Sequence, residues 1–249
     1  MDKASAEKKG LRLMSEANFR EFYRGYLYIE CRDILEDFIG DEITDDVTGI
    51  CTFGYIDDDA GLSFQPYKLG CMSDDGTFKE RDVPENISLL VLRYHSKYMH
   101  QEFHSDEGRV LVSTITPQDH YFTELTKLGI NLMDYAEFSQ KMCDSYDTAS
   151  PERTKLRGED YSYLDEFRYP GFPDDVVIIL YRPDAQPERA IVRCMFAANN
   201  EIFGTLMTEP KGNFGIHKGQ TIGFSEGKDG DTTLLFATGH TATAFNKDE

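Results

Sequence analysis

The chain has 249 residues, 40% of them hydrophobic, with 26 Lys and Arg against 45 Asp and Glu, a net charge of −19. This length and apolar content suit one large domain or two of ordinary size, and they exclude a largely disordered chain. Residues 1–150 carry a net charge of −14 and residues 151–249 a net charge of −5. The electrostatic field of this net negative charge repels phosphate backbones and anionic lipids, so we expect no nucleic acid and no membrane as partners.

The N-terminal sequence and the cysteines predict a cytoplasmic protein. The first 14 residues lack the apolar stretch of a secretory signal, and the longest apolar run, residues 176–181, is too short to span a bilayer. The cysteines are Cys31, Cys51, Cys71, Cys143 and Cys194. An odd number without a C-x-x-C pair fits neither a disulfide framework nor a cysteine-rich zinc site. We therefore expect reduced thiols, no metal and no cofactor.

The first predicted element is an amphipathic helix over residues 15–39. Aromatic and aliphatic side chains recur there every three or four residues, with charged residues between them. Ser15 fits its N-cap and Gly40 its end. We expect the aromatic stripe on this helix to pack into the core.

Short strands and further helices follow. Residues 50–56 and 87–94 predict strands between Asp- and Gly-rich turns, although the second run also fits a helix that continues through Phe103. Residues 110–115 are β-branched and end before Pro117, which predicts another strand. Helices are expected over about 118–128 and 131–146. The first 150 residues are thus predicted to form a helix-rich α+β domain.

A domain boundary is predicted near residue 150. Residues 144–158 lose the apolar periodicity and gain Ser, Thr, Pro and charged residues, which is typical of a linker. Beyond it, short apolar runs between turns predict a compact, mainly antiparallel β unit over residues 151–249. These runs are residues 176–181, 190–196, 201–207, 220–224 and 232–237.

Known catalytic and metal motifs are not matched. His100 and His104 would share one face of a helix, but Gln101 stands where H-E-x-x-H requires glutamate, so solvated or loop histidines are favoured over zinc. No G-x-S-x-G elbow occurs, residues 212–219 depart from the phosphate-loop pattern, and the acidic clusters lack the spacing of an EF-hand. No catalytic residue is therefore assigned from a motif.

Residues 204–219 are unusually rich in glycine and also contain a proline, a glutamate and a histidine. This composition predicts a defined loop between two strands. Its characteristic residues are Gly204, Pro210, Phe214, Gly215 and Gly219. Glu209 and His217 can meet across this loop. The favoured interpretation is a structural clasp that holds the loop backbone, and the alternative is an acid–base pair.

The pattern G-T-L-x-x-E-P-x-x-x-F-G-x-H-x-G-x-x-I-x-F, residues 204–224, resembles the signature of small bacterial domains of unknown function. In those domains the middle usually reads L-L-N-E-P, from which Met207 and Thr208 depart. The resemblance covers about residues 158–238 and none of the first 150. Some of these domains are predicted immunity proteins of polymorphic toxin systems, which implies a protein that occludes the active site of a toxin.

The leading hypothesis is therefore a protein-binding module of the immunity or regulatory kind that neutralises a basic toxin. Charge complementarity would steer the association, with the acidic N-terminal turns as the partner surface. The predicted partner-binding residues are Asp57, Asp58, Asp59, Asp74 and Asp75.

Two other functions remain open. One is a small-ligand binder or hydrolase-like enzyme that uses Glu209 and His217 with Tyr161, Tyr163 and Phe214 as aromatic neighbours. The other is a housekeeping scaffold, in which the acidity serves solubility alone.

Overall fold

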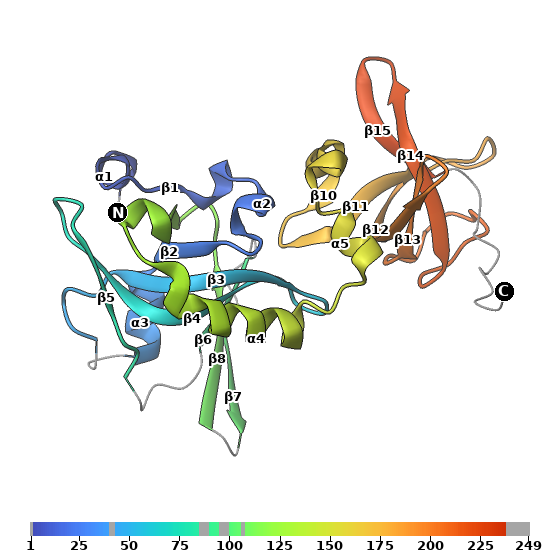
Figure 1. Ribbon diagram of the computed structural model, residues 1–249. Helices are drawn as coiled ribbons and strands as arrows, with labels where there is room; N and C mark the ends of the chain where they lie inside the picture. The colour runs from blue at the N-terminus through green and yellow to red at the C-terminus, as the bar shows by residue number, and fades with distance from the viewer. Residues whose placement is uncertain (1, 40–42, 85–89, 95–99, 106–107, 238–249) are drawn as a thin grey trace. The chain divides into compact units, whose positions relative to one another are not determined.

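The computed structural model describes residues 2–39, 43–84, 90–94, 100–105 and 108–237 (Figure 1). The chain divides into two compact units, Met1–Thr148 (unit 1) and Ala149–Glu249 (unit 2). Both units combine helices with sheet, so the chain is an α+β protein. Across the described ranges, no helix is long and apolar enough to cross a membrane.

Unit 1 is built on one large sheet. Its strands are β1 (Arg12–Leu13), β2 (Tyr26–Glu30), β3 (Gly49–Asp57), β4 (Gly61–Met72), β5 (Phe78–Arg81), β6 (Leu90–Tyr94), β7 (His100–Ser105), β8 (Gly108–Ile115) and β9 (Tyr121–Glu124). They follow the order β1-β9-β2-β3-β4-β6-β8-β7, and β5 pairs with β4. Neighbouring strands are antiparallel, except that β6 and β8 run parallel.

Short helices cover this sheet. They are α1 (Lys3–Lys8), α2 (Phe19–Phe22), α3 (Arg32–Ile39) and α4 (Ala136–Tyr146), with 3-10 turns η1 (Met14–Glu16), η3 (Leu125–Leu128) and η4 (Leu132–Tyr135). Leu27 and Ile29 of β2 pack into one core cluster, whereas Tyr28 packs into another with Tyr135. Because successive residues of a strand point to opposite faces, both faces of the sheet are buried. This explains why the central strands read as continuous apolar runs.

The helix predicted over residues 15–39 is wrong, and the first unit consists mostly of strands rather than helices. The segment forms η1, α2, β2 and α3 instead. Helix α2 begins at a capping box of Asn18 with Glu21 and ends because Arg24 takes a left-handed φ of 57°. A Cβ on Gly25 would lie 2.7 Å from the Glu21 carbonyl oxygen, so the chain can turn there only with glycine. The residues that follow pair with β3 and β9 on both sides.

The other predictions for unit 1 have mixed outcomes. The strands expected at 50–56 and 110–115 are confirmed as parts of β3 and β8. The alternative helix through Phe103 is wrong, because 100–105 form strand β7; residues 87–89 and 95–99 lie outside the described part. The helix over 118–128 is also wrong, since β9 and η3 occupy it, and the helix over 131–146 begins only at Ala136.

Unit 2 is a small barrel with a helical cover. It comprises α5 (Pro151–Lys155), the 3-10 segment η5 (Glu159–Phe167), and strands β10 (Arg168–Tyr169), β11 (Phe172–Leu180), β12 (Glu188–Ala198), β13 (Glu201–Leu206), β14 (Thr221–Asp229) and β15 (Thr232–Ala237). Successive strands pair antiparallel. The parallel pairing of Ile179 with Phe236 then closes the sheet on itself. Val176, Ile178 and Phe224 fill the interior.

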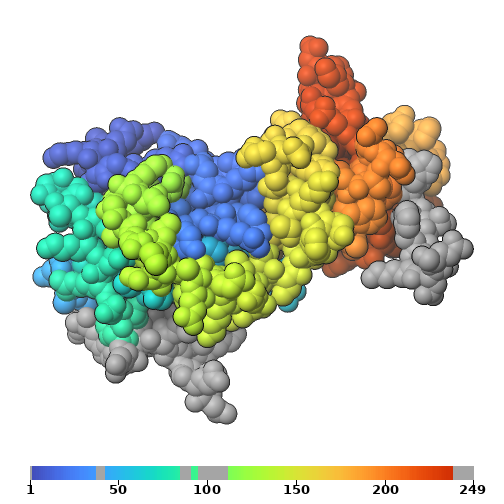
Figure 2. Space-filling model, viewed as in Figure 1, coloured from blue at the N-terminus to red at the C-terminus, as the bar shows by residue number. Residues whose placement is uncertain are grey.

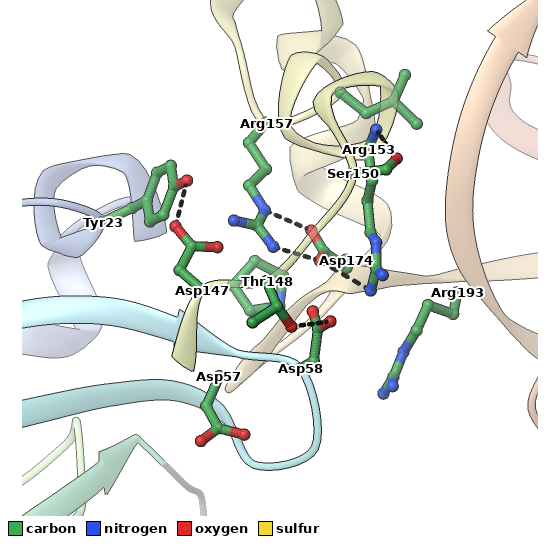
Figure 3. A network of polar contacts seen from close by, with 12 residues as sticks. Tyr23, Asp57, Asp58, Asp147, Thr148, Ser150, Arg153, Arg157, Asp174 and Arg193 are labelled. Carbon is green, nitrogen blue, oxygen red and sulfur yellow. Dashed lines mark hydrogen bonds and ion pairs between the residues drawn. The ribbon is translucent and has the colours of Figure 1, made fainter. Parts of the chain in front are cut away.

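Buried ion pairs attach the helical cover to the barrel. Arg157 donates to both carboxylate oxygens of Asp174, at 2.9 and 2.7 Å, as Figure 3 shows. The side chains are 1% and 8% exposed. Arg168, at the end of η5, bonds the Leu156 carbonyl oxygen at 2.6 Å and also the Pro173 carbonyl. These contacts fix η5 against the barrel and thereby position the tyrosines that it carries.

Candidate functional site

The five predicted partner-binding aspartates lie in two turns at opposite ends of one strand. Asp57 ends β3, with Asp58 and Asp59 in the β3–β4 turn that follows, and Asp74 and Asp75 lie in the β4–β5 turn. Strand β4 has 12 residues, which separates the two turns by roughly 35 Å. A standard interface covers about 800 Å² on each partner, or about 30 Å across. The two turns therefore belong to different surfaces.

The carboxylates of the β4–β5 turn have local partners. Asp74 lies 3.3 Å from the ammonium group of Lys9. Asp75 accepts a hydrogen bond from the Thr77 backbone N–H at 2.9 Å, and this bond lowers the pKa of its carboxyl group. Asp75 thus shapes the turn, as is common for aspartate, whereas the Asp74 side chain is fully exposed apart from its ion pair with Lys9.

The β3–β4 turn is built differently. Asp57 accepts hydrogen bonds from the backbone N–H groups of Asp59 and Ala60 at 2.9 and 2.8 Å, which shapes the turn. Asp58 accepts a hydrogen bond from the Thr148 hydroxyl at 2.9 Å, a contact drawn in Figure 3. The side chain of Asp59 is exposed. The turn therefore holds three successive carboxylates in a fixed backbone geometry.

An exposed aromatic ring lies beside this turn. Tyr146, the last residue of α4, is 43% exposed, and its ring centroid lies 5.6 Å from that of the buried Tyr55. Burial and the nearby Asp57 raise the pKa of Tyr55. Figure 2 shows α4, in yellow-green, at the surface of unit 1. We call Asp57, Asp58, Asp59 and Tyr146 the turn patch.

The structure brings Glu209 and His217 together. His217 Nδ1 lies 2.7 Å from Glu209 Oε1, and the backbone N–H of Lys218 donates to Glu209 Oε2 at 2.8 Å. These two bonds lower the pKa of Glu209, with His217 the larger cause. The side chains are 56% and 73% exposed, respectively. Both carboxylate oxygens of Glu209 are thus used to hold the loop.

The rest of the 204–219 loop is fixed by backbone contacts. Glu188 accepts hydrogen bonds from the N–H groups of Lys211 and Gly212 at about 3.0 Å. Gly219 has a φ of 88°, in the left-handed region that favours glycine. At Gly204, an added Cβ would lie 2.4 Å from the Arg193 carbonyl oxygen.

The other loop residues share these roles. Gly215 is also left-handed, with a φ of 74°. Phe214 packs against the barrel core. Pro210 follows Glu209 directly, between the two anchored parts of the loop. Gly204 thus lies within β13 rather than in the loop, and the other predicted loop residues shape the connection between β13 and β14.

An open pocket of about 380 Å³ lies at the other end of the barrel. Tyr161 and Tyr163 of η5 form one wall, and residues 197–202, the tip of the β12–β13 hairpin, form the rest. Strand β13 runs from this tip to the 204–219 loop. The two tyrosines are therefore not neighbours of Glu209 and His217, contrary to the ligand-site hypothesis.

Sequence reasoning missed the hairpin tip. Asn199 and Asn200 both have positive φ, at 53° and 62°. Two such residues form the tight turns that suit a two-residue hairpin, and asparagine tolerates this conformation better than most residues. The Asn-Asn pair between two apolar runs was the available signal.

The candidates for binding a metal ion and for acting as a nucleophilic thiol are the histidines, the acidic residues and the buried cysteines of the described part. No group of three His, Cys, Asp or Glu residues there could hold a metal ion. His100 and His104 lie on strand β7 and not on the helix that the zinc interpretation required. Burial raises the pKa of Cys31 and Cys51, and that of Cys194 to about 12, which keeps these thiols protonated and weakly nucleophilic.

The chain matches no protein-family model, no curated protein and no solved structure. The resemblance of residues 204–224 to immunity-type domains therefore stays a prediction.

Proposed function

We propose that this chain is a cytoplasmic protein-binding module that neutralises a basic protein, such as a bacterial toxin, by covering its active site. The turn patch, in which successive surface carboxylates lie beside a positioned tyrosine, carries the proposal. The proposed function requires no cofactor and no catalysis by the chain itself.

The charge of unit 1 favours a basic partner. Unit 1 has 15 Lys and Arg against 29 Asp and Glu. Many of these cations lie within 4.0 Å of a carboxylate, including Lys3, Lys9, Arg12, Arg24, Arg32, Lys68, Arg81 and Lys127. The surplus negative charge therefore has no counterpart within the unit. Such a surplus accelerates encounter with a positively charged protein and orients it.

Tyr146 supplies the apolar contact that charge alone lacks. Tyrosine is enriched among the residues that dominate binding energy at protein interfaces. The ring of Tyr146 is half exposed yet held against Tyr55, so little side-chain freedom is lost when a partner covers it. The neighbouring Asp58 and Asp59 would contact Lys or Arg side chains at the rim of such an interface.

The Glu209–His217 pair supports a structural rather than a catalytic role. An acid–base pair needs a substrate cleft, and the barrel pocket lies at the other end of β13. Glu209 also bonds the Lys218 backbone, which orients it toward the loop. We therefore propose that the two residues act as a clasp.

Affinity capture from a lysate of the source organism tests the proposed function. The wild-type chain is compared with the triple variant Asp58→Asn, Asp59→Asn, Tyr146→Ala, and with the matched control Asp74→Asn, Asp75→Asn. We expect the wild type and the control to retain the same basic protein, identified by mass spectrometry, and the triple variant to lose it. Retention of that protein by the triple variant would contradict the proposal.

A further inference from the structure

The open pocket of unit 2 has two aromatic rings on one wall. The ring centroids of Tyr161 and Tyr163 lie 6.3 Å apart, with their planes inclined by 39°. Tyr161 packs partly against the barrel core, whereas Tyr163 is 41% exposed. Ile202, which also lines the pocket, is 3% exposed and belongs to the core. The pocket therefore has an apolar inner side and an aromatic wall.

The opposite wall is a hairpin tip. The last pair of the β12–β13 ladder joins Ala198 to Glu201, and the two asparagines between them form the turn. The ladder therefore continues directly into the two-residue turn that lines the pocket.

A carboxylate gives the pocket a negative charge. Glu201 is one of the residues that line the pocket. Burial raises the pKa of Tyr163, with further contributions from Tyr161 and Glu226.

No Lys or Arg is among the pocket-lining residues that the structure describes. Arg168 also affects Tyr163 electrostatically, but its side chain is 4% exposed and is bonded to Asp165 and to two backbone carbonyls. It is therefore directed into the protein. Nothing on the pocket wall competes with an incoming cation.

We propose that this barrel-mouth pocket binds the guanidinium or ammonium group of a side chain from a basic polypeptide. A cation attracted by an aromatic face lies within about 6 Å of the ring centroid. Since the two centroids are 6.3 Å apart, one cation can contact both rings while Glu201 balances its charge. A neutral sugar also stacks on tyrosine, but it would gain nothing from the carboxylate.

This inference rests on the proposed function for the source of the cation, because a basic partner of unit 1 would carry suitable side chains. The binding chemistry belongs to unit 2 alone. A small probe therefore tests the pocket without the partner, and failure of the pocket can be distinguished from failure of partner capture.

The test is a titration of the ¹⁵N-labelled full chain with N-acetyl-L-arginine methylamide, followed by NMR. The neutral isostere N-acetyl-L-citrulline methylamide and maltose are titrated in parallel. We expect saturable shifts of the Asn199, Asn200 and Glu201 amides with the arginine probe only. Equal shifts with citrulline, or shifts with maltose alone, would overturn the proposal, as would an absence of shifts with every probe.

Variants then assign the binding to this pocket. Tyr163→Leu and Glu201→Gln should each weaken arginine binding about threefold to fivefold, since both remove one attractive contact at a partly exposed site. Tyr169→Leu and Asp231→Asn, which change an exposed tyrosine and an exposed carboxylate of the same unit outside the pocket, should leave it unchanged. Unchanged binding in both pocket variants, with their spectra showing an intact fold, would overturn the proposal.

Discussion

The two units use aspartate in opposite ways. In unit 2, the adjacent Asp174 and Asp175 are both buried and are paired with Arg157 and Arg193, respectively. In unit 1, the residues of the β3–β4 turn remain at or near the surface, and Asp59 is exposed. An Asp-Asp pair at the start of a barrel strand thus belongs to the fold, whereas a similar run in a hairpin turn lies nearer the solvent, where we propose that it meets a partner.

The buried carboxylates stabilise the fold, whereas we propose that the surface carboxylates recognise a partner. A buried ion pair is costly to break, because removing one partner leaves the other charge without compensation. A surface carboxylate contributes little to stability but acts at a distance on an approaching protein. Substitutions in each unit therefore test this difference.

The largest effect is expected for Asp174→Ala. It removes the buried carboxylate that accepts two hydrogen bonds from Arg157, so the free energy of unfolding of unit 2 should fall by about 3–5 kcal/mol. Urea denaturation followed by the NMR signals of unit 2 measures this. The matched control is Asp184→Asn in the exposed pair with Arg182, which should unfold like the wild type. If the unfolding free energy of Asp174→Ala were as little changed as that of the control, the Arg157–Asp174 pair would not stabilise the barrel.

A smaller and pH-dependent effect is expected for Asp33→Asn in unit 1. His120 is buried, with its Nε2 3.6 Å from Asp33 Oδ1 and its Nδ1 2.9 Å from the Thr116 carbonyl oxygen. Burial opposes the charged form, but the bonds to Asp33 and Thr116 outweigh it and raise the pKa of His120. The proton therefore stabilises the folded state below pH 6.5, and this contribution is lost as the pH rises through the folded pKa.

The Asp33→Asn substitution should lower the pKa of His120, which an NMR titration of the ring measures directly. Because the Asp33 side chain is 74% exposed, the cost in unfolding free energy should be about 0.5 kcal/mol or less at pH 6 and should vanish near pH 9. An unchanged His120 pKa would show that Asp33 does not interact with the ring in solution.

Almost no change in stability is expected for Asp58→Asn combined with Asp59→Asn. These side chains lie at the surface turn, and Asp58→Asn keeps an acceptor for the Thr148 hydroxyl. The unfolding free energy should stay within about 0.5 kcal/mol of the wild type. A loss as large as that of Asp174→Ala would assign the turn carboxylates to the fold and remove the contrast between the units.

The most local effect is expected for Glu209→Gln. The variant weakens the bonds to His217 and to the Lys218 backbone, so the Lys218 amide should exchange its hydrogen faster, with the strands of the barrel unaffected. Native-state hydrogen exchange measures this, and the Lys211 and Gly212 amides bonded to Glu188 are the internal control. Unchanged exchange at Lys218 would contradict the clasp.

Local sequence signals predicted the elements whose structure is decided locally. The strands at 50–56 and 110–115 have β-branched or aromatic runs bounded by turn residues. The helix over 15–39 was wrong because two short helices and a strand between them reproduce a helical spacing by chance. Helix α2 ends at the left-handed Arg24 and at Gly25, which lies close to the Glu21 carbonyl oxygen. Neither feature is visible in the spacing of the apolar residues.

The same distinction holds for the sites. Glu209 and His217 are eight residues apart on a glycine-rich loop, so their proximity follows from the local sequence. The tyrosine pocket could not be predicted, because Tyr163 meets the hairpin tip only through the packing of η5 on the barrel. That packing depends on Arg157 and Asp174, which are 17 residues apart and carry no local pattern.

The association rate of the captured partner at several salt concentrations tests the central proposal most directly. We compare the wild type with Asp58→Asn, Asp59→Asn and with the control Asp74→Asn, Asp75→Asn. The proposal predicts that the turn-patch variant associates about tenfold more slowly at low salt and depends less on salt, while the control resembles the wild type. Equal rates and equal salt dependence in all three proteins would contradict it.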